Sequence, residues 1–158
     1  QESRGLGDVY KRQVDEALKA GGAAVGAKAV IETLPGMFPL ACSPRLNDLF
    51  VENIKEYFPE TKIEDAGHFT ASTDMGDISH LMPSIHPFIG GVDGGLHTKD
   101  FCVTDFDAAA ILPGKVFAMN IIDLLYDEAA MAKEILEKEK PILTKEEYLA
   151  KLESYFQS

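Results

Sequence analysis

The sequence predicts an α/β fold, because segments with helical apolar spacing alternate with short apolar segments bounded by glycine and proline. The chain has 158 residues and is 46% apolar, which is enough for one ordinary domain with a core. Residues 84–90 read as a buried strand, and a glycine-rich loop follows them. Loops that follow strands are where α/β folds present functional side chains, so this region is the first place to look for a site.

The amino-terminal part of the chain predicts one helix and one strand. Residues 14–24 place apolar side chains at helical spacing, and residues 27–34 are rich in β-formers and end at Pro35. Residues 1–13 have no initiator Met and no apolar period, so we expect a truncated or non-native leader there. The proline-containing connection over residues 36–44 is the expected domain boundary.

Two helices are expected in the middle of the chain. Residues 45–58 have helical apolar spacing, with Ser43 suited to the N-cap and Pro44 to the first turn. A cluster of Ser, Thr and Asp precedes a second, short helix, which we expect to end before Pro83.

The carboxy-terminal part of the chain predicts further helix. Residues 105–125 carry a long apolar stripe, in which Pro113 predicts a break or kink. The acidic and lysine-rich residues 127–140 are expected to form a solvated helix face. Thr144 and Glu147 have the spacing of a capping box, which predicts the start of the last amphipathic helix.

Charge and cysteine spacing exclude several classes of function. Lys and Arg total 15 against 26 for Asp and Glu, and the net charge of −11 repels nucleic acid. We find no apolar run long enough to cross a bilayer and no secretory signal, so we expect a cytoplasmic protein without a membrane partner. Cys42 and Cys102 lack CxxC spacing, which predicts buried thiols in a reducing compartment.

Four histidines are candidates for chemistry, and three have ordinary explanations. His86 lies in the expected strand, where we expect it to be packed and hydrogen-bonded, and His80 lies near the end of a short helix, whose dipole it complements. His68 lies in a loop. His97 differs because it follows the glycine-rich loop, and neutral imidazole is the commonest protein ligand of zinc. Spacing alone leaves a structural role and a metal-binding role for His97 equally open.

Two segments carry a family resemblance. Residues 72–90 (STDMGDISHLMPSIHPFIG) and residues 96–101 (LHTKDF) resemble the carboxy-terminal signature of the zinc-dependent amidohydrolases of the aminoacylase/carboxypeptidase type. They are most similar to the branch that contains the aminobenzoyl-glutamate utilisation hydrolases and the aminoacylase-like dipeptidases. With less detail, the resemblance extends over residues 14–127.

The resemblance implies a particular architecture. The chain would be part of a zinc-exopeptidase-like α/β catalytic domain with a remnant of an α+β lid, through which the subunits of the intact protein form a homodimer. Residues 14–43 would be the end of this lid and dimerisation domain. Residues 44–158 would be the carboxy-terminal part of the catalytic domain.

The resemblance also implies metal-dependent hydrolysis of an amide bond in an N-acyl amino acid, a dipeptide or an aminobenzoyl-glutamate conjugate. In that family a water between two zinc ions attacks the carbonyl, while a glutamate transfers its proton to the leaving nitrogen. His97 matches the last metal ligand, and manganese or cobalt would also suit imidazole. The other ligands and the general base have no match in this sequence, so the fragment alone is expected to be inactive.

The resemblance places Ser72, Thr73 and Asp74 in a loop beside the substrate pocket, where they would orient an amino-acid carboxylate. Helix capping explains these residues equally well. Two other interpretations of the chain stay open. One is a non-catalytic binding or oligomerisation module built on half of the hydrolase fold. The other is an unrelated small α/β domain in which His97 is structural.

Overall fold

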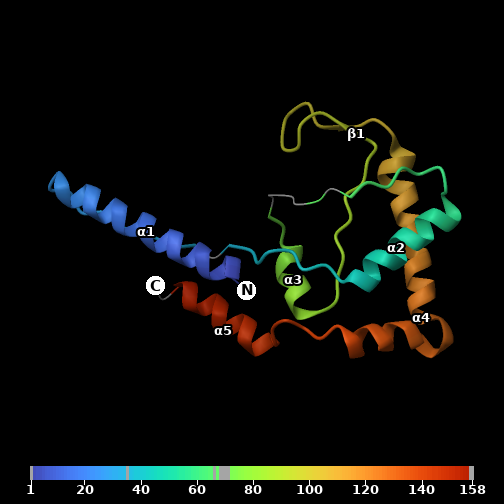
Figure 1. Cartoon of the computed structure of the whole chain (residues 1–158). Coiled ribbons are helices and arrows are strands. Elements are labelled where there is room, and N and C mark those ends of the chain that lie inside the picture. Colours follow the sequence, from blue (N-terminus) through green and yellow to red (C-terminus); the bar gives the residue numbers. More distant parts are fainter. Residues whose placement is uncertain (1, 35, 66, 68–71, 157–158) are drawn as a thin grey trace. The chain divides into compact units, whose positions relative to one another are not determined.

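The computed structural model describes residues 2–34, 36–65, 67 and 72–156, and these form two compact units (Figure 1). One unit comprises Gln1–Pro35 and Lys151–Ser158, and the other comprises Gly36–Ala150. The division falls at the start of the connection expected to be a domain boundary, although the assignment to lid and catalytic domain stays a prediction. The elements in chain order are α1 (Glu2–Ala24), α2 (Pro44–Tyr57), α3 (Met75–Leu81), β1 (Val92–Asp93), β2 (Cys102–Val103), η1 (Asp107–Ile111), α4 (Leu112–Lys138) and α5 (Lys145–Phe156).

Helix α1 is longer than the sequence predicts. It begins at Glu2 instead of residue 14, and the truncated or non-native leader expected at residues 1–13 stays a prediction. The segment contains no proline, and the ion pair between Lys11 and Asp15, with 2.6 Å from Nζ to Oδ2, joins side chains one turn apart. Lys19 and Glu16 form a second such pair at 2.9 Å. Leu6, Val9 and Tyr10 also continue the helical spacing of the apolar residues after Gln13, so the apolar period reaches into this segment.

Residues 27–34 are extended but form no strand, which contradicts the prediction. Val30 is 82% exposed and Leu34 is 74% exposed, so the apolar side chains of this segment pack on nothing within the described part of the chain. A strand exists only where a neighbouring strand accepts and donates its backbone hydrogen bonds. Residues 27–34 have the composition of a strand, but composition does not supply the second strand with which they would pair.

Helix α2 matches its prediction closely. The Ser43 hydroxyl accepts a hydrogen bond from Leu46 N at 3.1 Å, and Pro44 occupies the first turn. One face of α2 packs on α4, where Phe50, Ile54 and the fully buried Val116 form the core of this unit. Figure 1 shows the two helices side by side. The predicted cap, first turn and apolar face are thus confirmed.

Helix α3 is short and well anchored. It ends before Pro83, as the sequence predicts. Gly76 is required in its first turn, because a Cβ atom there would lie 1.8 Å from the carbonyl oxygen of Phe38. Asp77 and Ser79 hold the same neighbouring segment, since Phe38 N donates to Asp77 Oδ1 at 2.8 Å and Ala41 N donates to Ser79 Oγ at 3.0 Å. The side chains of α3 therefore hold residues 36–43 against this helix.

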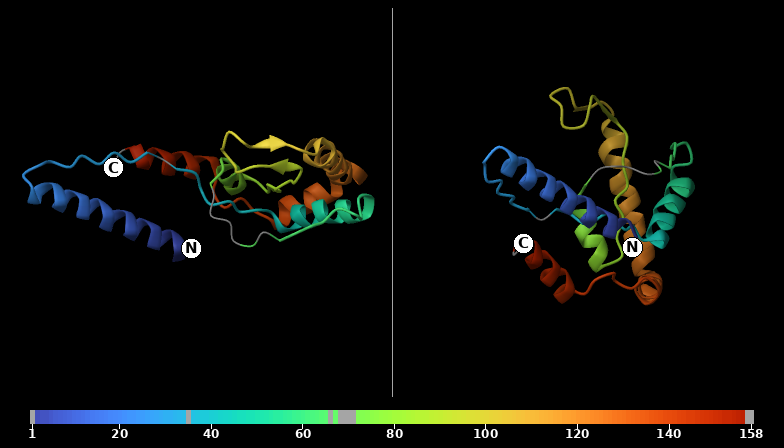
Figure 2. Two further views of the ribbon diagram at one scale, coloured as in Figure 1. Left: turned by 90° about the horizontal axis from the view of Figure 1, so that it is seen from above. Right: turned by 60° about the vertical axis from the view of Figure 1, so that its left-hand side comes forward.

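Residues 84–90 are extended but are not a strand, and Phe88 is 65% exposed, so the predicted buried strand was wrong in both its pairing and its burial. The described residues contain one sheet, in which β1 and β2 pair antiparallel with Val92 opposite Val103 (Figure 2). These strands are only two residues long, and helices make up most of the described chain. The α/β class and its zinc-exopeptidase-like form therefore stay predictions.

Helix α4 breaks at a different place from the predicted one. Pro113 lies in its first turn, where proline needs no hydrogen-bond partner, and the helix continues through it. The break comes at Tyr126, which is extended with ψ 153°, and continues through Asp127, Glu128 and Ala129, whose φ values are 49°, 55° and 60°. Left-handed backbone costs a non-glycine residue about 1–2 kcal/mol. Figure 1 shows the sharp change of direction that results.

The continuous run Asp107–Lys138, formed by η1 and α4, is long and apolar enough by length and composition to cross a membrane, with a mean hydropathy of 1.6 in its most apolar window. The expectation that no run reaches this length was therefore wrong. Length and composition are weak evidence, because the core helices of water-soluble proteins meet the same criterion. The left-handed residues at 127–129 also interrupt this run. The absence of a membrane partner stays a prediction.

Helix α5 begins with the predicted capping box. Thr144 N donates to Glu147 Oε2 at 2.8 Å, and Glu147 N donates to Thr144 Oγ1 at 3.2 Å. The backbone hydrogen bond from Thr144, followed by the bond with its side chain, lowers the pKa of Glu147 below its ordinary value. Both orphan donors at this helix start are satisfied reciprocally, as the spacing indicates.

The capping box predicts a pH dependence with a defined sign. Because the folded-state pKa of Glu147 is depressed, its contribution to stability is present above the unfolded value of about 4.3 and is lost as the pH falls through the folded value. An NMR titration of the Glu147 carboxyl should give the low pKa directly, and Thr144→Ala should raise it part of the way. In Glu147→Gln, which keeps the box without a charge, this acid-dependent loss should disappear. A Glu147 pKa at its ordinary value in the unmodified chain would contradict the prediction.

Candidate functional site

The glycine-rich loop between β1 and β2 has a compact backbone that only glycine allows. Gly94 has φ 83°, and a Cβ atom on it would lie 2.3 Å from Asp100 O. Asp93 Oδ1 accepts a hydrogen bond from Gly94 N at 2.7 Å, which fixes the entry to the loop. The two sides of the loop therefore approach more closely than any side chain at Gly94 would permit.

His97 lies in this loop in a left-handed conformation. Its φ is 61°, a region where histidine occurs several times more often than most non-glycine residues. A turn fixes it, because Thr98 N and Thr98 Oγ1 both donate to Gly95 O, at 3.1 and 2.7 Å. The His97 side chain is exposed, as is the neighbouring Leu96 at 61%. The loop thus presents an imidazole to the exterior and does not bury it in the apolar interior.

The carboxylates near His97 in sequence already have structural partners. Asp93 binds Gly94 N, Asp100 pairs with Lys99 at 2.9 Å, and Asp105 Oδ1 accepts from Ala108 N at 3.0 Å. Among the described residues, no group of three or more His, Cys, Asp or Glu side chains could hold a metal ion. His97 is therefore suited to act as one ligand, and this part of the chain does not supply the others.

Ser72, Thr73 and Asp74 lie at the start of α3. Thr73 Oγ1 accepts a hydrogen bond from Met75 N at 3.3 Å, so this hydroxyl has the capping role that the sequence left open. The side chain of Asp74, at the N-cap position, makes no capping bond to the described part of α3, and both Ser72 and Asp74 are exposed. Within the described residues, no hydrogen bond joins these three residues to the loop of His97. Their role in substrate binding stays a prediction.

Asp77 is a half-buried anchoring residue, whereas its sequence position favours a surface acid over a metal ligand paired with Asp74. Its Oδ1 accepts from Phe38 N, and its Oδ2 accepts a hydrogen bond from the Tyr148 hydroxyl at 3.2 Å. Partial burial, followed by the charge of Asp77, raises the pKa of Tyr148 above its ordinary value. Its position one turn after Asp74 was the available signal, but the partners are 39 and 71 residues away in sequence.

Two of the other histidines can be compared with expectation. His80 lies in the last turn of α3, as predicted. It is also completely buried, its Nδ1 lies 2.9 Å from Gly76 O, and its ring packs on Phe38 with 4.9 Å between centroids. His86 is packed as predicted, but its buried Nδ1 has no hydrogen-bond partner among the described residues, which contradicts the prediction. His68 lies outside the described residues.

The two cysteines also differ from expectation. Cys102 is exposed on β2, and Cys42 is only half-buried, so the prediction of two buried thiols was wrong. Both are free thiols. Cys42 lines a cavity of about 170 Å³ together with Met82, Glu139 and Lys140.

Comparison with known proteins gives one informative similarity. The chain is 28% identical over 131 residues to the Xaa-Arg dipeptidase of the mouse, Mus musculus. The matched region covers 78% of this chain and 30% of the dipeptidase, so the chain spans less than a third of that relative's length. No family model and no solved structure matches the chain. The similarity supports a distant relationship to dipeptidases. It gives no support for the narrower assignment to the aminobenzoyl-glutamate branch.

Proposed function

We propose that this chain is the carboxy-terminal part of a metal-dependent peptidase or amidohydrolase, in which His97 contributes one ligand to a two-metal zinc site. The observation that carries the proposal is the exposed imidazole of His97, held in a left-handed turn at a glycine-rich loop. The similarity to a dipeptidase supports the reaction class. The substrate would be a dipeptide, an N-acyl amino acid or an aminobenzoyl-glutamate-like conjugate.

The donor set of the described residues fits only part of such a site. A catalytic zinc needs about three protein ligands, and the described residues contain no group of three suitable side chains. We therefore propose that the remaining ligands and the general base lie in sequence beyond these 158 residues, and that this chain alone is inactive. Zinc, when bound, would acidify a water for attack on the amide. Manganese or cobalt would suit the same imidazole.

The residues of this chain would bind and orient the substrate. His97 in its neutral form offers one nitrogen lone pair to a metal. The exposed Ser72 hydroxyl is a hydrogen-bond donor available to an amino-acid carboxylate, while Thr73 fixes the turn that holds it. We also expect the intact protein to be a cytoplasmic homodimer that associates through its lid domain.

A non-catalytic binding or oligomerisation module is the second candidate. The observation that favours it is the lack of a metal-binding group among the described residues. The two candidates differ in what the complete protein does. An enzyme would contain bound metal and hydrolyse peptides, whereas a module would do neither.

We expect His97→Asn to abolish most activity in the complete protein that contains this sequence. Asparagine tolerates positive φ, so the turn is kept while the imidazole is lost. Hydrolysis of an Xaa-Arg dipeptide and of an N-acetyl amino acid should fall by at least about 100-fold, with a loss of bound metal measured by mass spectrometry.

The matched control is Lys99→Gln, a change in the same exposed loop that removes no metal ligand and should leave the metal content unchanged. Full activity and unchanged metal in His97→Asn would remove His97 from the site. A complete protein without bound metal and without hydrolysis would instead favour the non-catalytic module.

A further inference from the structure

The break in α4 is conformationally unfavourable for its own sequence. Residues 115–140 contain neither glycine nor proline, and most of them are good helix formers. Nevertheless Asp127, Glu128 and Ala129 are left-handed in succession. Their local preference is for a continuous helix, so contacts elsewhere in the unit Gly36–Ala150 must hold the bend.

The part of α4 before the break is fixed to α2. Val116 is completely buried, and Asn53 Nδ2 donates to Asn120 Oδ1 and to Asp123 Oδ2, both at 2.8 Å. A straight α4 would keep all of these contacts, because none involves a residue after Asp123. This part of the helix therefore serves as the fixed arm of the bend.

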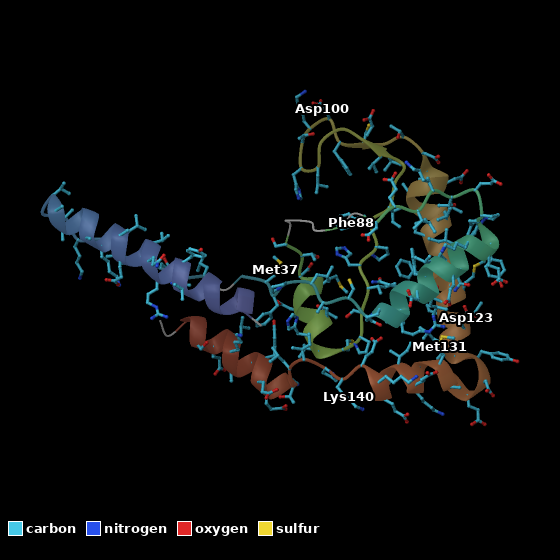
Figure 3. The ribbon with its side chains drawn as sticks, in the orientation of Figure 1. Met37, Phe88, Asp100, Asp123, Met131 and Lys140 are labelled. Atoms are coloured by element: carbon cyan, nitrogen blue, oxygen red, sulfur yellow. The ribbon has the colours of Figure 1, made fainter. Side chains whose placement is uncertain are left out.

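The part after the break is held by a different set of anchors. Arg45 Nη2 donates to Met131 Sδ at 3.8 Å, Arg45 N donates to Glu139 Oε1 at 3.2 Å, and Ile135 is buried. Figure 3 labels Asp123 and Met131, which lie on opposite sides of the break and both beside α2. Further along, the backbone NH groups of residues 142 and 143 donate to His80 O, at 2.9 and 3.0 Å. Straightening α4 would break these contacts.

The movable part also forms one wall of the cavity of about 170 Å³. Residues 41–44 and 79–83 supply two walls, and residues 139–142 supply the third. The third wall follows the last helical segment of α4, residues 130–138, and would move away with it when the helix straightens. Cys42, a half-buried residue of the first wall, would then become more accessible.

We propose that residues 126–129 are a strained hinge, and that exchange between the bent helix and a straight helix closes and opens this cavity. The two states share the contacts of the fixed arm. They differ in whether strain at three left-handed residues is offset by the anchors of Arg45, Ile135 and His80. The hinge involves neither His97 nor a metal site, so it does not depend on the proposed function.

The hinge can be tested by distance measurement. Spin labels on Ala118→Cys and Leu136→Cys, with Cys42 and Cys102 replaced by serine, report the state of the helix, since both positions are exposed. A straight helix over these 18 steps spans about 27 Å. Ala129→Gly relieves the left-handed strain of the bent helix. It should therefore reduce the population of the straight helix, measured at about 27 Å, about fivefold. Ala129→Val increases the strain and should raise that population by a similar factor.

The matched control is Ala130→Gly, which makes the same chemical change at a residue that is right-handed in both states, so the ratio of the two populations should stay unchanged. In a Cys102→Ser protein, labelling of Cys42 by iodoacetamide should be slower with Ala129→Gly and faster with Ala129→Val. A single short distance in all variants would overturn the proposal. Distances that shift in the same direction for Ala129→Gly and Ala129→Val would overturn it equally.

Discussion

Replacing Gly76 with alanine is expected to lower the free energy of unfolding of the unit Gly36–Ala150 by at least about 3 kcal/mol. The added Cβ would lie 1.8 Å from the carbonyl oxygen of Phe38 and 2.9 Å from its carbonyl carbon. The Phe38 backbone cannot move away without breaking its hydrogen bond to Asp77, which measures 2.8 Å. Movement of α3 instead would break the hydrogen bond that Ala41 N donates to Ser79 Oγ at 3.0 Å.

The matched control is Gly114→Ala. Gly114 is helical, and no atom of the described residues outside its own helical turns lies within 4 Å of the place that a methyl group would take, so alanine there should stabilise the helix by about 1 kcal/mol. Urea denaturation followed by circular dichroism gives both values. The same glycine-to-alanine change should therefore have opposite signs at the two positions. A destabilisation by Gly76→Ala of less than about 1 kcal/mol would show that the contact between α3 and Phe38 is looser than described.

Features with local causes could be predicted from the sequence. The Ser43 cap with Pro44, and the box formed by Thr144 and Glu147, depend on residues at most three positions apart. Their hydrogen bonds form as soon as the helix does, so their signals in the sequence are complete. The starts of α2 and α5 follow from these pairs.

Features that depend on distant partners could not be predicted in the same way. Residues 27–34 and 84–90 have strand composition, but a strand requires a neighbour that composition does not specify. The break in α4 was expected at Pro113, where proline is tolerated, and it lies at residues 126–129, where the local sequence favours helix. Tertiary contacts such as those of Arg45 outweigh that local preference.

The candidate site also combines features with local causes and features that depend on distant partners. The glycine-rich loop was evident from the sequence, because glycine spacing is a local signal for tight turns, whereas the exposure of His97 is known from the structure. The anchoring role of Asp77 was not evident, since Phe38 and Tyr148 lie 39 and 71 residues away. A metal site assembled from several segments depends on equally distant partners. Sequence spacing can therefore identify one ligand such as His97 without specifying the rest.

Asn53→Ala is expected to lower the free energy of unfolding of the same unit by about 2–4 kcal/mol. Asn53 is 5% exposed and Asn120 is 4% exposed, so their amides are bonded away from water. One amide group, Nδ2 of Asn53, serves both Asn120 Oδ1 and the Asp123 carboxylate, at 2.8 Å each. Truncation would leave a buried carbonyl without a donor and would remove a charge-assisted hydrogen bond.

Asn47→Ala provides the matched control, because Asn47 is exposed on the same helix and its side chain makes no hydrogen bond within the described residues. Its effect should lie within about 0.5 kcal/mol. Asn53→Ala combined with Asn120→Ala should cost less than the sum of the two single changes, by about 1 kcal/mol, because each single change already breaks the shared bond. Strict additivity would mean that the two amides do not interact in solution. The packing of Phe50, Ile54 and Val116 would then determine the pairing of α2 with α4 without help from this polar contact.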